Sequence, residues 1–274
     1  MRFFARRRWF SVFALILLSS AAVLAHIHGS AIVPRFNYVT GWVLFAVILF
    51  LSIYNVRKKL PFLPLGSSES WLQFHVYAGL FTAVLFAVHV SFKVPTGWFE
   101  GTLAWLYGLV MISGLAGLFL SRAAPKRLTT FGGEVLFERI PAIRSALRKQ
   151  AEALALTSIP QVQSTTIAEF YVRDLKDFFE GPRNFWLHLF QIRRPLGTLL
   201  NHITDLNRYL DEKERATLAQ IAELVRQKDG LDYHYALQLV LKGWLFTHIP
   251  LTYSLLLLTL VHVVLVFAFS GGAR

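Results

Sequence analysis

Five long apolar runs are the feature that most constrains how this chain can fold. They cover residues 9–25, 39–56, 71–92, 103–120 and 243–269. A helix needs roughly 20 mainly apolar residues to cross the hydrocarbon core of a bilayer. A spanning segment of this length must be helical, because no water is available there to bond with the backbone. We therefore predict an all-α integral membrane bundle of about five spans.

The distribution of charge supports this prediction and excludes other classes of protein. Only 16% of the 274 residues are charged, against about 25% in a soluble domain. Between residues 122 and 242 lie 18 of the 28 basic and 14 of the 16 acidic side chains. The remaining basic residues flank apolar runs, so the net charge of +12 indicates membrane topology rather than nucleic-acid binding. A soluble enzyme, a disordered tail and a nucleic-acid binder are excluded.

The same flanks predict three parts of the chain and their sides of the membrane. Residues 1–121 hold spans one to four, residues 122–241 form a helical insert, and residues 242–274 hold the fifth span and a short outer tail. The positive-inside rule places the amino terminus and the insert in the cytoplasm and the carboxyl terminus outside the cytoplasmic membrane. Three arginines (Arg6, Arg7 and Arg8) precede the first run, which is either a retained span, the favoured interpretation, or a signal segment.

The insert is expected to be helical and to carry no catalytic motif of its own. One helix is predicted over residues 134–156, kinked or split by Pro141, and another over 211–229, ending at Gly230. Residues 185–190 form an aromatic patch that either packs in a core, the favoured interpretation, or lies on the membrane surface. No phosphate loop, dinucleotide fingerprint, zinc spacing or Ser/His/Asp arrangement is present in the insert.

Four histidines lie inside the apolar runs, where polar side chains are costly. His75 and His89 are 14 residues apart in the third run, and His248 and His262 are 14 apart in the fifth. Fourteen residues are close to four helical turns, so each pair shares one helix face and is separated by about 21 Å along the axis. One histidine of each pair can therefore lie near each edge of the bilayer.

The third and fifth runs also match outside their histidines. Residues 71–76 and 244–249 align without gaps on a Trp and a His, and Leu85 falls opposite Leu258. Both runs are expected to cross the membrane in the same direction. His75 and His248 then share a level near the cytoplasm, and His89 and His262 share one near the outside.

Two imidazoles that face each other at one level are the axial ligands a haem iron takes. We predict two haem b groups, the inner held by His75 with His248 and the outer by His89 with His262. A lone membrane histidine is more often a hydrogen-bonded core residue, but two pairs of equal spacing favour ligation. Zinc or proton binding in a transporter would place the ligands at one level rather than two.

This pattern of histidines resembles membrane b-type cytochromes. It is similar to the cytochrome b subunit of quinol–cytochrome c reductases, and to the transmembrane core of ferric reductases and NADPH oxidases, whose third and fifth spans carry the ligands. The resemblance covers residues 71–120 and 243–269 and leaves out the insert. The chain stops at Arg274 without a sixth span or a flavin or nicotinamide domain. We therefore expect one subunit of a larger system.

The resemblance implies electron transfer across the membrane. We expect a relay between a quinone pool or cytoplasmic redox partner and a partner outside, with lipid, a quinone or quinol, and a partner subunit or cytochrome as contacts. The alternatives are a self-contained enzyme like the ferric reductases and, less favoured, a transporter that uses its histidines.

Weaker predictions concern basic and small residues near the expected haems. Haem propionates commonly meet cations at the membrane edge, and the candidates are Arg57, Lys58, Lys59, Arg122 and Lys242 inside, with Lys93 and Arg35 outside. Each of these could equally be a topology residue. Small residues that could admit the macrocycle, or else allow close helix contact, are Gly79, Gly108, Gly114 and Gly117.

Overall fold

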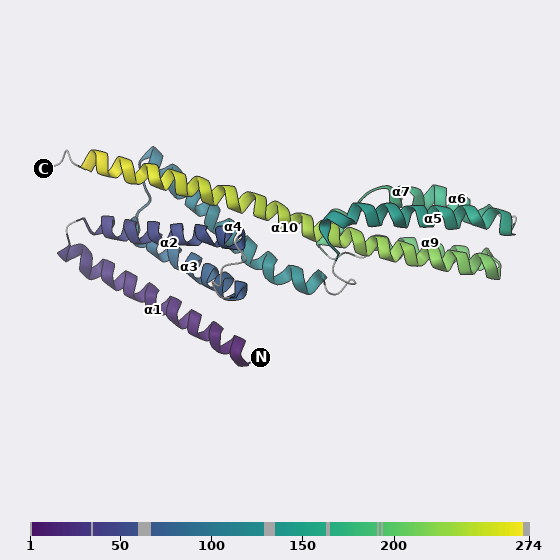
Figure 1. Ribbon diagram of the computed structural model, residues 1–274, viewed down its shortest axis with the longest axis horizontal. Helices are drawn as coiled ribbons and strands as arrows, with labels where there is room; N and C mark the ends of the chain where they lie inside the picture. Colours follow the sequence, from purple (N-terminus) through teal and green to yellow (C-terminus); the bar gives the residue numbers. More distant parts are fainter. Residues whose placement is uncertain are drawn as a thin grey trace. The chain divides into compact units, whose positions relative to one another are not determined.

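The computed structural model describes residues 2–33, 35–59, 67–128, 135–162, 165–190, 192 and 194–270. All regular secondary structure in these ranges is helical, which confirms the predicted class. The chain divides into two compact units (Figure 1). The bundle unit comprises Met1–Phe119 and Trp244–Arg274, and the inserted unit comprises Leu120–Gly243.

Within the described ranges, five helices are long and apolar enough to cross a membrane, as predicted. The first four are α1 (Arg2–Ile32), α2 (Phe36–Lys59), α3 (Ser68–His89) and α4 (Trp98–Leu128), and the fifth is α10 (Glu212–Ser270). The bundle unit holds α1 to α3, α4 as far as Phe119, and α10 from Trp244 onward. The third helix ends at His89, three residues before the predicted end of its apolar run, with Ser91 and Phe92 at positive φ.

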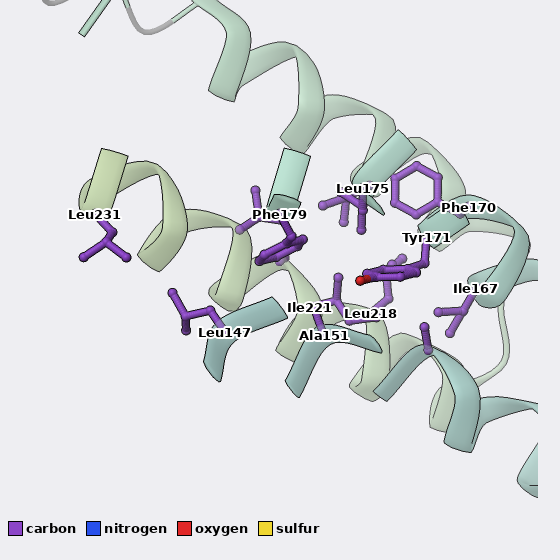
Figure 2. Close-up of a cluster of buried hydrophobic side chains, with 14 of the residues drawn as sticks. Leu147, Ala151, Ile167, Phe170, Tyr171, Leu175, Phe179, Leu218, Ile221 and Leu231 are labelled. Carbon is purple, nitrogen blue, oxygen red and sulfur yellow. The ribbon is translucent and has the colours of Figure 1, made fainter. Parts of the chain in front are cut away.

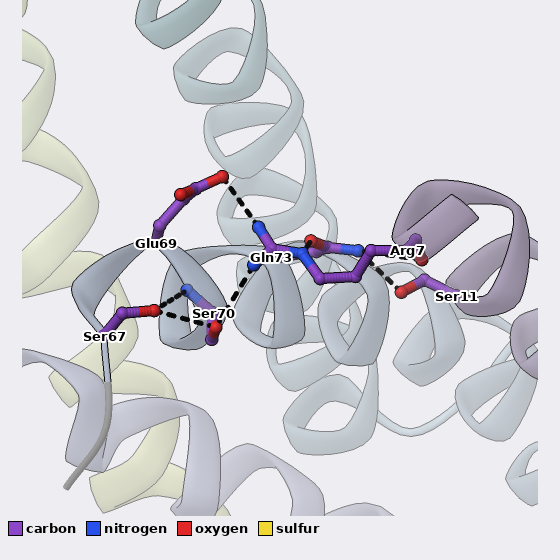
Figure 3. A network of polar contacts seen from close by, with 6 residues as sticks. All are labelled: Arg7, Ser11, Ser67, Glu69, Ser70 and Gln73. Atoms are coloured by element: carbon purple, nitrogen blue, oxygen red, sulfur yellow. Dashed lines mark hydrogen bonds and ion pairs between the residues drawn. The ribbon is translucent and has the colours of Figure 1, made fainter. Parts of the chain in front are cut away.

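A polar network joins the amino-terminal ends of α1 and α3 (Figure 3). Arg7 pairs with Glu69 at 2.7 Å and donates to the Ser70 Oγ at 3.3 Å and to the Gln73 side chain. The Gln73 amide donates in turn to the Ser11 Oγ at 2.7 Å. Near the other ends, the ring of His26 on α1 lies 5.8 Å from that of Phe92, just after α3. The two helices therefore run in the same direction, and the first apolar run is part of the bundle unit.

The core of the bundle unit brings α2, α3, α4 and α10 together. Its buried members are Leu44, Ile48, Leu85, Tyr107 and Leu255. The Thr82 hydroxyl donates to the Gly79 carbonyl at 2.7 Å, so the Tyr107 hydroxyl donates to the Thr82 oxygen at 3.0 Å. This bond satisfies two buried hydroxyls, and it fixes the register of α3 against α4.

The inserted unit has its own hydrophobic core (Figure 2). Its elements before α10 are η2 (Phe137–Arg139), α5 (Ile140–Val162), α6 (Thr166–Phe170), η3 (Tyr171–Leu175), α7 (Lys176–Glu180), α8 (Phe185–Leu189), α9 (Arg194–Leu206) and η4 (Asn207–Tyr209). Ile167, Leu175 and Phe179 pack with Leu218 and Ile221 of α10, and all five are nearly inaccessible to solvent.

The predicted helix end at Gly230 is wrong. The helix α10 runs through this position without interruption. A glycine inside a helix costs only about 1 kcal/mol, and the neighbouring Asp229 and Leu231 are buried, so packing keeps the segment helical. Pro141 lies in the first turn of α5, where its missing N–H costs no hydrogen bond.

A buried ion pair lies on α10 within the inserted unit. The Lys228 Nζ lies 2.5 Å from the Asp232 Oδ2, and both side chains are almost fully buried. Lys228 also donates to the Gly181 carbonyl at 2.8 Å, and Asp232 accepts from the Arg183 backbone N–H at 3.0 Å. These bonds fix the Gly181–Pro182 break between α7 and α8 against α10.

Candidate functional site

His89 and His262 lie next to each other in the bundle unit. Their ring centres are 6.5 Å apart, and the ring planes are nearly perpendicular at 89°. His89 is the last residue of α3, and His262 lies near the end of α10. Phe99 of α4 stacks on His262 with ring centres 6.3 Å apart.

Both histidines line one cavity of about 270 Å³. Its wall comes from α2, α3, α4 and α10, and most of the lining side chains are apolar or aromatic, among them Trp42, Phe86, Tyr107 and Phe267. Ligand pockets are commonly roughly 300–1,000 Å³ in volume, so this cavity lies at the lower edge of that range. Its lining, mostly apolar with a few polar side chains, is of the kind found in ligand pockets.

Residues of α2 hold the ring of His89 in place. Its Nδ1 lies 3.1 Å from the Asn37 carbonyl oxygen and 3.4 Å from the Thr40 Oγ1. The carbonyl can only accept, so Nδ1 carries the proton and the lone pair on Nε2 is left for a metal or another donor. Gly41 makes room for this arrangement, because a Cβ there would lie 2.8 Å from the His89 Cε1.

His248 is held by α4 and by its own helix. Its Nδ1 lies 3.2 Å from the Ser113 Oγ, and its ring stacks on Trp244 with centres 5.5 Å apart. The Trp244 indole donates to the Ser113 carbonyl at 2.8 Å. Its ring fills the notch at Gly117, where a Cβ would lie 1.9 Å from the Trp244 Cζ2.

His75, the fourth membrane histidine, packs against Tyr54 of α2. The two ring centres are 4.9 Å apart and the planes are tilted by 35°. The pairing of His75 with His248 stays a prediction.

The four glycines singled out from the sequence fall into two groups. Gly117 and Gly114 face side chains of α10, because a Cβ at Gly114 would lie 3.8 Å from the His248 Cε1. A Cβ at Gly79 or Gly108 would meet no atom within 4 Å. Close helix contact explains the first pair, and open space surrounds the second.

The basic candidates for propionate binding have different surroundings. Lys242 pairs with Glu138 at 2.6 Å and lies over the Phe137 ring within the inserted unit. This pairing lowers the pKa of Glu138 from its ordinary value. Arg35 lies over the Tyr38 ring at 5.8 Å. The side chains of Lys93 and Arg122 are exposed, whereas the structure describes only the backbone, and not the side chains, of Arg57, Lys58 and Lys59.

No group of three or more His, Asp or Glu side chains that could hold a metal ion occurs among the described residues. Haem ligation of the predicted type needs only two. The chain matches no known family, no curated protein and no solved structure.

The contacts of Asn37, Thr40, Gly41 and Ser113 were not foreseen from the sequence. Each lies on a helix other than that of the histidine it touches, and no spacing within a single run indicates such a contact. Gly41 alone gives a weak indication, because it has no side chain and lies in an apolar run directly after Thr40, where a ring could approach.

Proposed function

We propose that this chain is a di-haem b-type cytochrome that carries single electrons across a membrane. His89 and His262 would hold the outer haem, and His75 and His248 the inner one. The observation that carries the proposal is the approach of His89 and His262, from two helices distant in sequence, at the wall of one apolar cavity.

The distance between these rings suits two ligands of one iron. A nitrogen–metal bond is about 2 Å long, so imidazoles on opposite sides of a metal have ring centres roughly 6 Å apart. The observed separation is 6.5 Å. Each ring can rotate about its nitrogen–metal axis, so the perpendicular planes are compatible with ligation. An edge-to-face aromatic pair has a similar separation, and the experiment below distinguishes the two.

The environment of His89 also suits a ligand. Metal-binding histidines almost always donate their second ring N–H to a carbonyl, carboxylate or water, which fixes the ring and raises its basicity. The Asn37 carbonyl accepts such a bond from His89 at 3.1 Å. Ser113 is placed to play the same part for His248 at 3.2 Å.

A bound haem supplies reversible one-electron chemistry at its iron. The residues of this chain hold and orient it, and the apolar wall of the cavity keeps water away from it. The inserted unit, on the cytoplasmic side in this proposal, would dock a redox partner or cover the inner site. Electrons would pass between a quinone pool or cytoplasmic partner and an acceptor or donor outside.

A spectrum of the purified full-length chain tests this proposal. We expect b-type bands in the reduced-minus-oxidised difference spectrum and two haems per chain by pyridine haemochrome. His89→Ala and His262→Ala should each remove one haem. His28→Ala is the matched control, because this exposed histidine bonds only to the Leu24 carbonyl of its own helix among the described contacts. Colourless protein, or an unchanged haem count in both ligand variants, would leave an aromatic pair as the explanation.

A further inference from the structure

We propose that the inserted unit rests on the membrane through an aromatic patch formed by Trp186 of α8 and Phe190, the residue directly after α8. This patch would lie in the interfacial layer of the bilayer that the apolar helices cross. The sequence favoured a core position for these residues, and the structure contradicts it: Trp186 is 66% exposed and Phe190 69% exposed.

The two aromatic side chains are held outward by contacts on the other side of α8. They are four residues apart, so they share one face. On the opposite face His188 is buried, with its Nε2 3.5 Å from the Asp229 Oδ1. Leu189 packs against a small cluster with Tyr233 and Leu237. The patch is therefore fixed in place by α10 rather than carried on a loose loop.

Its support lies directly before the point where the chain enters the fifth apolar run. Leu237 precedes Gly243 by six residues, which is about 9 Å along a helix. Since α10 is continuous through both residues, the patch is attached to the chain close in sequence to a segment apolar enough to cross a membrane.

The chemistry of the surrounding segment favours lipid over a protein partner. Residues 181–194 contain Arg183, Arg193 and Arg194 and no acidic residue, and of these Arg183 pairs with Asp177 at 3.7 Å. Tryptophan prefers the membrane interface, and nearby arginines attract anionic headgroups.

The absence of cysteine allows a direct test on the full-length chain. A nitroxide spin label is attached to Trp186→Cys, and in a second variant to Phe190→Cys, in chains reconstituted into bilayers containing anionic lipid. Val172→Cys is the matched control: it is 65% exposed and follows Tyr171, which lies beside Leu218 at the far end of the inserted core (Figure 2). Relaxation by oxygen and by a water-soluble nickel chelate reports the depth of each label.

We expect a several-fold higher ratio of oxygen to nickel accessibility at positions 186 and 190 than at 172. Equal ratios at all three positions would overturn the proposal. So would labels that are immobilised and shielded from both reagents, since that result indicates a protein surface, including a second copy of this chain. The measurement needs no haem, so its outcome is independent of the function proposed above.

Discussion

Replacing Gly117 by alanine should disturb the packing of α4 against α10. In the notch at Gly117, the new Cβ would lie 1.9 Å from Cζ2 and 2.3 Å from Cε2 of Trp244. Carbon atoms in contact are normally about 3.5–4.0 Å apart. The indole must therefore retreat by about 2 Å, because the two backbones are fixed by the helices.

The cost of this movement has two parts. The Trp244 Nε1 donates to the Ser113 carbonyl at 2.8 Å, and a shift of about 2 Å breaks that bond at a cost of about 1 kcal/mol. Overpacking a well-filled contact costs about 1–3 kcal/mol more. We expect Gly117→Ala to lower the free energy of unfolding by about 2–4 kcal/mol in total. The stacking of Trp244 on His248 is lost as well, so in the proposed cytochrome the haem held by His248 should bind less tightly than the one held by His262.

Unfolding of the purified chain in detergent, followed by circular dichroism, measures the first effect, and the haem count measures the second. Gly108→Ala is the control on the same helix, since its Cβ would meet nothing within 4 Å. Trp244→Ala removes the clashing ring, so adding Gly117→Ala in that background should cost little. If Gly117→Ala is no worse than Gly108→Ala, or costs as much without the indole, the explanation by this contact is refuted.

Three further predictions concern other contacts. Gly41→Ala should tilt the ring of His89. In the proposed cytochrome this should shift the reduction potential of one haem only, which a redox titration resolves. Equal shifts of both potentials would contradict this prediction. Asp232→Ala leaves the Lys228 ammonium buried without its carboxylate and should lower the free energy of unfolding, measured with a chemical denaturant, by about 3–5 kcal/mol. A loss as small as that of a surface substitution would show that the pair is dispensable. Lys242 lowers the pKa of Glu138, so this pair stabilises the fold above the ordinary glutamate pKa of 4.5 and ceases to do so as the pH falls below it. The melting temperatures of wild type and Glu138→Gln should therefore converge in acid, and a gap that widens there would reverse the sign.

The sequence was most informative where one regular pattern, such as the length of an apolar run or a fixed spacing, determines the structure. Long apolar runs fix helices by length alone, and the helices α1 to α4 and the end of α10 follow them. The spacing of 14 residues places His89 and His262 at equivalent positions of two helices, and the structure brings these rings together.

Contacts between helices could not be predicted, because they depend on rotation and register. Asn37 and Ser113 reach their histidines from neighbouring helices, and no local pattern marks them. The helix end predicted at Gly230 was wrong for a related reason, since the preference of glycine for a helix end is weaker than the packing of its buried neighbours. Trp186 and Phe190 were assigned to a core because composition does not indicate which side of a short helix has a partner.

The cavity wall is discontinuous along the chain, and this affects how the protein can be made. His89 is synthesised 173 residues before His262, with the whole inserted unit between them. At about 5–20 residues per second, the ribosome needs roughly 10–35 s to cover that distance. During this interval α2, α3 and α4 expose an apolar surface without its last wall, and any ligand that bridges the two histidines can be captured only once α10 has emerged.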